Sequence, residues 1–469
     1  MTNILPEKSE NHEVESTVSH FFKEFKIGTL LNRANVKKTR GVSPVVLFQF
    51  LFTLVFTSKS GNQAILSSKA PEEISVYTVN RFMNAKTFNW RKFLILLSES
   101  IIVKRLLSLV ESDSERVLII DDSTYSRNRS KKVELLAKVY DHSTGTFMRG
   151  FRMLTLGWSD GISFIPLAHT LLSSEKKQAR LMEANDQLDK RTVGYKRRVE
   201  AQQKATKALF DLLDSINPRT LQAKTVLFDS WFAYPKTIKQ VVTDYPLQVI
   251  CMLKPTRTTY GYNGQKYNLK DLYRVLKKKR GRAKIKASVV VSLGLNDNNE
   301  DIQAKIIFVR DNRRGKKNWL ALLSTDVDLP DEEIIRLYGK RWQIETFFKY
   351  SKSYLKLSNE FSARDYDNMV AHTAVVFTRY MMFALISREE KDPRTIGELF
   401  YLCCDEMENI RFAQSLFLVM ACLKETLMNE LVLSEQHVQD LLDTIFDSLP
   451  ELFKPFLKEN QLNQISKAA

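Results

Sequence analysis

Residues 331–356 (DEEIIRLYGKRWQIETFFKYSKSYLK) combine one internal acid with several cations at helical spacing. At about 100° per residue, a helix puts a phenol, a guanidinium, a carboxylate and two ammonium groups on one arc, namely Tyr338, Arg341, Glu345, Lys349 and Lys352. Carboxylates bind hard metal ions, and guanidinium and ammonium groups bind phosphates. The arc therefore suits metal and phosphate chemistry. The alternative interpretation is a solvated helix face with helix-spaced ion pairs.

Two further acidic positions follow short patterns typical of buried strands. The run VLII at 117–120 ends in Asp121-Asp122, and TVLF at 225–228 ends in Asp229. Open α/β sheets hold ligands at the carboxyl ends of their strands. Successive strand side chains point to opposite faces, so only one of Asp121 and Asp122 can face a given pocket. One aspartate after a strand is an ordinary turn residue. Two of them, with Glu345 on a cation-lined helix, favour a shared site.

Such a site would carry phosphodiester chemistry. Asp122, Asp229 and Glu345 lie far apart in the sequence, so only a fold can bring them together. Hard oxygen ligands suit Mg²⁺ or Mn²⁺. Two such ions about 3.5–4 Å apart activate a water or a 3′-hydroxyl and stabilise the leaving oxygen. Arg341, Lys349 and Lys352, with Tyr338 beside them, would bind the DNA phosphates that flank the cleaved bond.

Length and composition are compatible with this chemistry. The chain has 469 residues, which predicts two to four domains, and a net charge of +17, which points to a polyanionic partner. Its four cysteines show no zinc or disulfide spacing, as expected in a reducing cytoplasm. The N-terminus is polar and acidic, so it does not resemble a signal peptide. The longest apolar run, 45–56, is too short to span a bilayer.

The sequence divides into regions that differ in composition and hydrophobic periodicity. Hydrophobic periodicity and turn residues predict a helical region over 1–112, a strand-rich core over 113–253, a β-rich insertion over 254–325, a return to the core over 326–385 and an acidic helical region over 386–469. The basic residues that recur in the first region fit a DNA-binding domain, and the alternative is a helical bundle with a basic surface. The last region is a poor surface for DNA and is a candidate for self-association.

The insertion carries most of the positive charge. Between Lys254 and Leu320 there are 18 Lys or Arg residues against 5 acids. An excess of that size favours phosphate contacts, although a solvated loop tip is the alternative for its most basic run. The residues of that run predicted to bind DNA are Lys277, Lys278, Lys279, Arg280 and Arg282.

The spacing Tyr338-x2-Arg341-x3-Glu345-x6-Lys352 resembles the Tyr-Arg-Glu-Lys signature of the insertion-sequence-four group of DDE transposases. The motifs IDDST at 120–124 and LFDSWF at 227–232 are similar to the first- and second-aspartate motifs of that group. The likeness covers roughly residues 113–385. It selects Asp122 over Asp121 as the first catalytic acid, with Ser123 a mild departure from the usual threonine.

The resemblance implies an RNase H-like α/β core, interrupted by the β-rich insertion, with two Mg²⁺ or Mn²⁺ ions held by Asp122, Asp229 and Glu345. It implies a transposase that cleaves element ends at terminal inverted repeats and transfers 3′-hydroxyl strands into target DNA, through a hairpin intermediate and as a homodimer in the synaptic complex. Such an enzyme would be cytoplasmic and nucleoid-associated, without a membrane anchor. Some relatives stack a tryptophan on a flipped base; Trp319 is the candidate, Trp231 its rival, and core packing the alternative for both.

Two other functions remain open from the sequence. The basic insertion alone would permit a non-catalytic or domesticated DNA-binding derivative. The presence of all three acids argues against such a loss of catalytic activity. A general RNase H-like nuclease would use the same acids on DNA that lacks inverted repeats.

Overall fold

The structure is a computed structural model that describes residues 16–57, 74–110, 114–141, 144–279, 283–311, 319–361, 363–389, 394–430 and 435–448. The chain forms two compact units. One unit contains Met1–Glu24, Phe56–Ser58 and Gly397–Ala469, and the other contains Phe25–Val55 and Lys59–Ile396. The strands and the predicted site residues all belong to the second unit.

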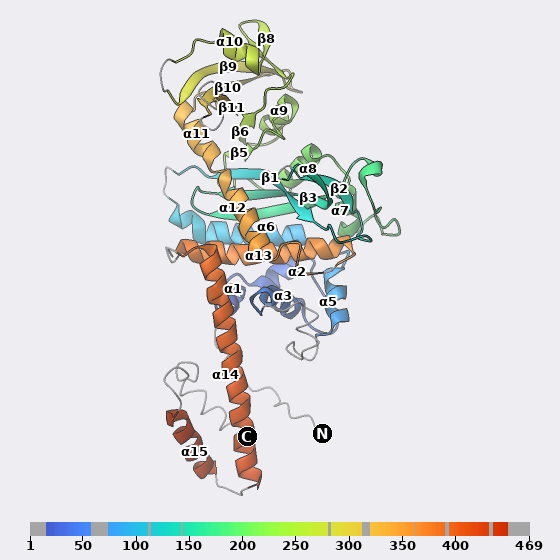
Figure 1. The fold of residues 1–469 in the computed structure, drawn as a ribbon, viewed down its shortest axis with the longest axis vertical. Coiled ribbons are helices and arrows are strands. Elements are labelled where there is room, and N and C mark those ends of the chain that lie inside the picture. The colour runs from blue at the N-terminus through green and yellow to red at the C-terminus, as the bar shows by residue number, and fades with distance from the viewer. Residues whose placement is uncertain are drawn as a thin grey trace. The chain divides into compact units, whose positions relative to one another are not determined.

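The second unit is built on one mixed sheet of eleven strands (Figure 1). Its order is β2-β3-β1-β5-β6-β11-β10-β9-β7-β8, with β4 paired to β3. The strands are β1 Val117–Ser126, β2 Ala137–Asp141, β3 Thr146–Ser159, β4 Phe164–Leu172, β5 Thr225–Phe228, β6 Gln248–Leu253, β7 Thr259–Tyr262, β8 Gln265–Asn268, β9 Ile285–Leu295, β10 Asp301–Arg310 and β11 Trp319–Ser324.

The centre of the sheet is parallel, and the two aspartate-tipped strands are neighbours there. β1 pairs with β5 in parallel, with Ile120 opposite Phe228, and β5 pairs in parallel with β6. All four residues of β5 and the first four of β1 are buried. Such continuous apolar strands occur where both sheet faces are covered. The sequence prediction that the acids of both strands meet at one sheet edge is consistent with this register.

The helices include α1 Thr17–Glu24, α14 Ile396–Glu430 and α15 Glu435–Ser448, which lie wholly or almost wholly in the first unit. Those of the second unit are α2 Ile27–Arg33, α3 Pro44–Thr53, α5 Val76–Met83, α6 Trp90–Ile101, α7 Val193–Ala201, α8 Ala205–Leu213, α9 Pro235–Asp244, α10 Leu269–Val275, α11 Asp331–Gly339, α12 Trp342–Ser353 and α13 Tyr366–Glu389. Short 3₁₀ or π segments cover Leu54–Thr57, Ile102–Leu106, Leu107–Leu109 and Lys177–Ala179.

Helix α13 is the central helix of the second unit. Among the described residues it is the one helix that is long and apolar enough to cross a membrane, but 89% of its apolar window is buried inside the protein. It also carries buried charged residues with partners, such as Asp367 and Arg379. These properties identify α13 as a core helix and not as a membrane span.

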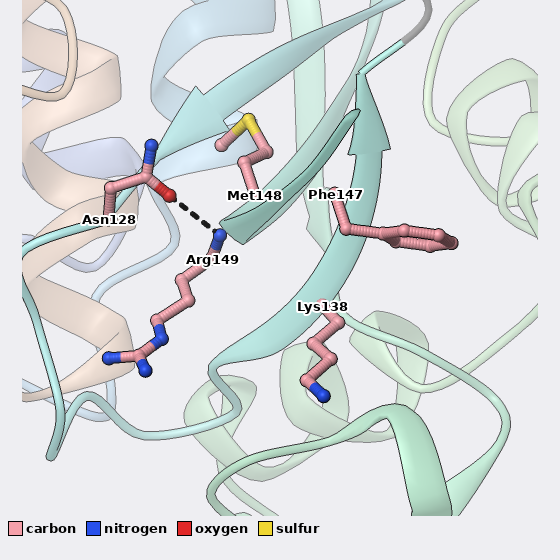
Figure 2. A pocket seen from close by; sticks show the side chains of 5 residues that line it. All are labelled: Asn128, Lys138, Phe147, Met148 and Arg149. Carbon is pink, nitrogen blue, oxygen red and sulfur yellow. Dashed lines mark hydrogen bonds between the residues drawn. The ribbon is translucent and has the colours of Figure 1, made fainter. Parts of the chain in front are cut away.

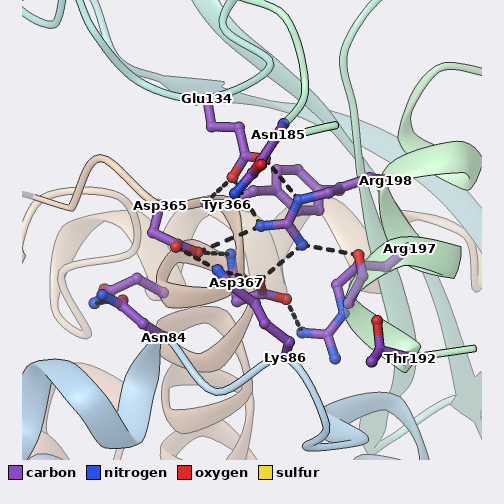
Figure 3. Close-up of polar contacts among 12 residues, drawn as sticks. Asn84, Lys86, Glu134, Asn185, Thr192, Arg197, Arg198, Asp365, Tyr366 and Asp367 are labelled. Atoms are coloured by element: carbon purple, nitrogen blue, oxygen red, sulfur yellow. Dashed lines mark hydrogen bonds and ion pairs between the residues drawn. The ribbon is translucent and has the colours of Figure 1, made fainter. Parts of the chain in front are cut away.

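A buried ion cluster joins α13 to segments that are distant in sequence (Figure 3). The Asp367 carboxylate lies 2.9 Å from Lys86 Nζ, 2.8 Å from Arg197 Nη1 and 2.7 Å from Arg198 Nη1. Arg198 also binds Glu134, which precedes β2. Burial alone would raise the pKa of Asp367, but these cations hold it below its ordinary value. The cluster therefore fixes the α5–α6 connection, α7 and the β1–β2 loop to one end of α13.

The region expected to be a β-rich insertion extends the central sheet. Strands β7 to β11 and helix α10 form it, and β11 returns to pair with β6 through Leu323 opposite Cys251. The strand-like sequence runs at 287–293, 302–309 and 319–323, which indicate a β-rich segment, correspond to β9, β10 and β11. The insertion is thus hydrogen-bonded to β6, which is the neighbour of β5, the strand that Asp229 follows.

Packing between β3 and β4 leaves no room at Gly157. A Cβ atom there would lie 2.2 Å from the ring of Phe164, which is itself packed against Phe347. Overfilling a packed core costs about 1–3 kcal/mol. We therefore expect Gly157→Ala to lower the unfolding free energy by about that amount in urea denaturation. Gly339→Ala is the control, because a Cβ atom added there would have no atom outside its own helix within 4 Å; equal destabilisation by both would contradict the packing argument.

Candidate active site

The cation-lined segment 331–356 is not one regular helix. α11 ends at Gly339 and α12 begins at Trp342, so the helix on which the arc was drawn is interrupted between these residues. Lys340 and Arg341 keep right-handed dihedrals (φ −61°, ψ −24° and φ −54°, ψ −29°). Their amides donate three residues back, to Leu337 and Tyr338, at 3.0 and 3.1 Å. Gly339 has a low helix propensity, and the buried Lys340 ammonium donates to carbonyl oxygens of Glu115 and Asp160. The turn therefore tightens without reversing the chain.

Arg341 joins the helix to the sheet. Its Nη1 lies 2.7 Å from Asp121 Oδ2, and its Nη2 lies 2.5 Å from Glu345 Oε1. The first carboxylate ends the buried part of β1, and the second lies one turn along α12. Glu345 is 36% exposed, so it can be reached from solvent, whereas Asp121 is 13% exposed. The structure thus brings a β1 acid and the α12 acid to one guanidinium.

Asp121 was not among the acids selected from the sequence. Burial raises its pKa to about 7, which the Arg341 charge opposes and the charges of Asp229 and Asp122 reinforce. Its Oδ1 accepts the backbone amide of Asp122 at 2.8 Å. The alternation of β1 was the signal available in the sequence, because it showed that the two aspartates must serve different faces.

Asp122, the predicted catalytic acid, is held by Arg152 of β3. Arg152 Nε lies 2.7 Å from Asp122 Oδ2, and Nη2 lies 2.7 Å from Oδ1. The Arg152 guanidinium carbon also lies 5.1 Å from the ring centroid of Trp231. Asp122 is therefore on the Arg152 and Trp231 side of the strand, next to the position of Asp229. No pattern in the sequence pointed to Arg152.

Asp229 follows β5 directly. Burial raises its pKa, with the negative charge of Asp122 adding to the shift, while the Trp231 amide, which donates to Oδ1 at 2.8 Å, and the Arg341 charge oppose it. Asp229 therefore lies within electrostatic reach of both Asp122 and Arg341. Among the three sequence-selected acids, Asp122 and Asp229 interact electrostatically, and Glu345 is connected to this region through Arg341, which also binds Asp121.

The remaining helix residues lie around this region. Lys352 Nζ donates to Ser123 Oγ at 2.8 Å and lies 3.3 Å from Thr124 Oγ1, and burial lowers its pKa. Tyr338 is half-buried, with its ring centroid 5.8 Å from the Arg341 guanidinium carbon, and burial raises its pKa. Lys349 is exposed. The arc expected from helical spacing therefore survives the break at Lys340, because the break keeps right-handed geometry.

The described insertion residues that were predicted to bind DNA are not among the residues that contact these acids or Arg341. Trp319 is half-buried and packs with Tyr273 and Phe308 at centroid distances of 5.3 and 4.9 Å. Lys277, Lys278 and Lys279 are exposed after α10. Arg280 and Arg282 lie outside the described residues. Trp231, the rival stacking residue, is 38% exposed beside Asp229.

Hard carboxylate oxygens of this kind fit Mg²⁺ or Mn²⁺ by chemistry. Among the described residues, however, no group of three His, Cys, Asp or Glu side chains is arranged to hold a metal ion. Arg152 and Arg341 neutralise the carboxylates instead. Metal binding would therefore require at least one guanidinium to exchange its partner.

Residues 64–286 match the family described as DDE superfamily endonuclease. The match supports a DDE-type transposase or endonuclease. It includes Asp121, Asp122 and Asp229 and ends before α12, so it does not reach Glu345. No curated protein matches the chain. The DDE-type assignment and the mixed α/β sheet agree with the coarse fold and activity expected from the sequence.

Proposed function

We propose that this DDE-type protein is a DNA transposase of the insertion-sequence-four type, with an RNase H-like core. In this proposal it cleaves element ends at terminal inverted repeats and joins the 3′-hydroxyl strands to target DNA, through a hairpin cut-and-paste route and as a homodimer in the synaptic complex. The observation that carries the proposal is the bridge from Asp121 through Arg341 to Glu345, beside Asp229. It supports a site shared by β1, β5 and α12.

Asp122, Asp229 and Glu345 would hold the divalent ions. When bound, two such ions supply an activated water or 3′-hydroxyl and stabilise the leaving oxygen. Arg152 is the side chain that must release Asp122; it is long and 22% exposed, so it can withdraw towards solvent. Asp121 is less suited to this role, because its Oδ1 accepts a backbone amide and its Oδ2 is held by Arg341. Asp121 instead orients Arg341.

The chain's cations would then position DNA. Arg341, released from Glu345 but still held by Asp121, can bind a phosphate bidentately. Lys352 is fixed against Ser123 and offers a point charge along the same strand. Lys349 is exposed on the same helix and can contact a phosphate farther out. Arg341 and Lys352 both contact the Asp121 face of β1, so a strand bound along that face would meet both cations.

The adjacent aspartates give a direct test of these roles. We expect Asp122→Asn to lower metal-dependent cleavage by roughly 10³-fold, since losing several kcal/mol of transition-state stabilisation has that effect. Asp121→Asn should lower it about 10–100-fold, as loss of an outer-shell partner does. Cleavage of a labelled duplex under single-turnover conditions measures both. The reverse ranking would assign the ligand role to Asp121.

Substrate choice separates a transposase from a general nuclease. The test uses a duplex that carries the inverted repeats flanking the gene and a second duplex of scrambled sequence, both with Mg²⁺. The proposal expects cutting at the repeat end only, followed by strand transfer to a target duplex. Equal cutting of both duplexes would identify a general nuclease, and binding without cutting would identify a non-catalytic derivative.

A further inference from the structure

The β2–β3 hairpin presents an unusual solvent-facing surface. In the antiparallel register Lys138 is directly opposite Arg149, and Tyr140 is directly opposite Phe147. All four side chains are exposed, Phe147 to 71% and Tyr140 to 41%. The two rings contact edge to face with centroids 5.2 Å apart. We call these four residues the hairpin face.

The hairpin face is poorly explained by stability alone. Like charges directly opposite each other on paired strands are destabilising. Among the described residues, no ion pair to Lys138 or Arg149 is found. Exposed aromatic side chains also do not contribute the free energy that burial of their apolar surface in the core would provide. A cross-strand pair of cations beside a pair of exposed rings therefore indicates a partner that supplies negative charge and flat apolar surface.

A shallow cavity of about 470 Å³ adjoins this face (Figure 2). Asn128, Lys138, Phe147, Met148 and Arg149 line it. Asn128 Oδ1 accepts the Arg149 amide at 2.8 Å, and the Arg127 amide donates to the Arg149 carbonyl at 2.8 Å. Both bonds fix the backbone beneath Arg149. The cation is therefore held on a backbone fixed by two hydrogen bonds, and Arg129, which follows Asn128 in the loop after β1, is exposed.

The hairpin face lies on the same side of the sheet as the Arg341 bridge. Directly paired antiparallel residues point to one face, and Asp121 is paired with Thr155 of β3. Phe147 and Arg149 alternate in phase with Thr155, so they share the face of Asp121. Lys352, at Ser123, lies on that face along the way. The distance along β3 from Thr155 to Phe147 is about eight residues, or roughly 27 Å.

We propose that the hairpin face is a second DNA-binding surface, in which Lys138 and Arg149 neutralise backbone phosphates and Tyr140 and Phe147 pack on sugar and base edges. The inference rests on the proposed function, because Arg341 and Lys352, the cations proposed to position DNA at the cleavage site, lie on the same sheet face. At a rise of about 3.4 Å per base pair, the face contacts duplex about eight base pairs from the cleaved bond.

The test is the salt dependence of DNA binding by the full chain, measured by fluorescence anisotropy without divalent metal. Each lost phosphate contact lowers the slope of log K against log salt by about 0.9. We expect Lys138→Gln/Arg149→Gln to reduce the slope by about two on a duplex that extends 15 or more base pairs beyond the cleavage site. Lys190→Gln/Lys196→Gln, which removes two exposed charges from another part of the unit, should leave it unchanged.

Further measurements test the aromatic contact and the position of the hairpin face along the duplex. Phe147→Ala should weaken binding several-fold with no change of slope, because it removes apolar contact and no charge. On a duplex cut to about four base pairs beyond the cleavage site, the charge variant and the unmodified chain should bind alike. The charge variant should melt at an unchanged or higher temperature, because it removes a cross-strand repulsion.

The outcomes distinguish this inference from the proposed function. If the chain cleaves DNA and the charge variant keeps the full salt slope, the hairpin face does not bind DNA, while the nuclease proposal stands. If the charge variant changes the sedimentation of the chain and not its DNA binding, the face is a contact between copies and the inference fails. If the chain neither binds nor cleaves DNA, both proposals fail together.

Discussion

Glu345→Gln is expected to lower metal-dependent DNA cleavage by roughly 10³-fold while DNA binding survives. The carboxylate is the α12 member of the acid group and is partly open to solvent, so it is available to a metal ion and to DNA. Removing one ligand of a catalytic metal forfeits several kcal/mol of transition-state stabilisation, and each 1.36 kcal/mol is a factor of ten. Single-turnover cleavage and anisotropy on the same duplex measure the two effects.

Glu332→Gln is the matched control. Glu332 is an exposed acid in the first turn of α11, so its loss changes the net charge by the same amount without touching the Arg341 bridge. It should cleave at the unmodified rate. Undiminished cleavage by Glu345→Gln, with thermal melting that shows a folded protein, would remove α12 from the site and with it the proposed function.

The second large effect concerns stability. Glu360, His372 and Arg379 form a group whose side chains are at most 1% exposed, with Arg379 Nη1 2.7 Å and His372 Nε2 3.1 Å from Glu360 Oε2. Arg379 also donates to the carbonyl of Phe52 at 2.9 Å, which ties α13 to the end of α3. Breaking one partner of a buried ion pair costs about 3–5 kcal/mol. We expect Glu360→Gln to lower the unfolding free energy by that amount in urea denaturation at pH 7.

The same group predicts a pH dependence. Burial alone would raise the pKa of Glu360, but Arg379 and His372 outweigh it and hold the pKa at about 2. A carboxyl with a depressed folded-state pKa stabilises the fold above its unfolded value, near 4.5, and loses that contribution as the pH falls through about 2. The unmodified chain should therefore lose more stability than Glu360→Gln between about pH 4.5 and 2.

Glu333→Gln controls for the loss of a carboxylate from an ordinary ion pair. Glu333 pairs with Arg336 on α11, where the arginine is half exposed, and surface pairs contribute at most about 1 kcal/mol. A similar loss of stability in both variants would show that the Glu360 group contributes no more than a surface pair.

Sequence patterns predicted the parts of this molecule that depend on local chemistry. The aliphatic runs before Asp121 and Asp229 marked β1 and β5, and the spacing from Tyr338 to Lys352 brought the cations of α12 to one side. These features follow from period-two and period-3.6 patterning, which is visible in a single chain. The mixed α/β architecture followed from the same patterns.

Contacts between segments that are distant in the sequence could not be predicted from such local patterns. Arg152 reaches Asp122 because β3 pairs with β1, and a partner across strands has no fixed sequence separation. The break at Lys340 depends on carbonyls of Glu115 and Asp160 that lie elsewhere in the chain. The ring neighbours of Trp319, the proposed stacking residue, are Tyr273 and Phe308, which come from α10 and β10. Each of these outcomes was set by tertiary contacts.

The pairing of β11 with β6 makes the insertion part of the scaffold that surrounds it. β6 is an interior strand because β11 returns beside it, with Leu323 opposite Cys251. Without that return, the backbone donors and acceptors of β6 would face outward as an unprotected edge, which is a template for intermolecular strand pairing. The segment that carries most of the basic charge therefore also protects the core against aggregation. Deleting the insertion would therefore remove the proposed DNA contacts and expose the edge of β6 at the same time. The proposed DNA contacts can change only at residues of β9–β11 and their loops whose side chains are exposed.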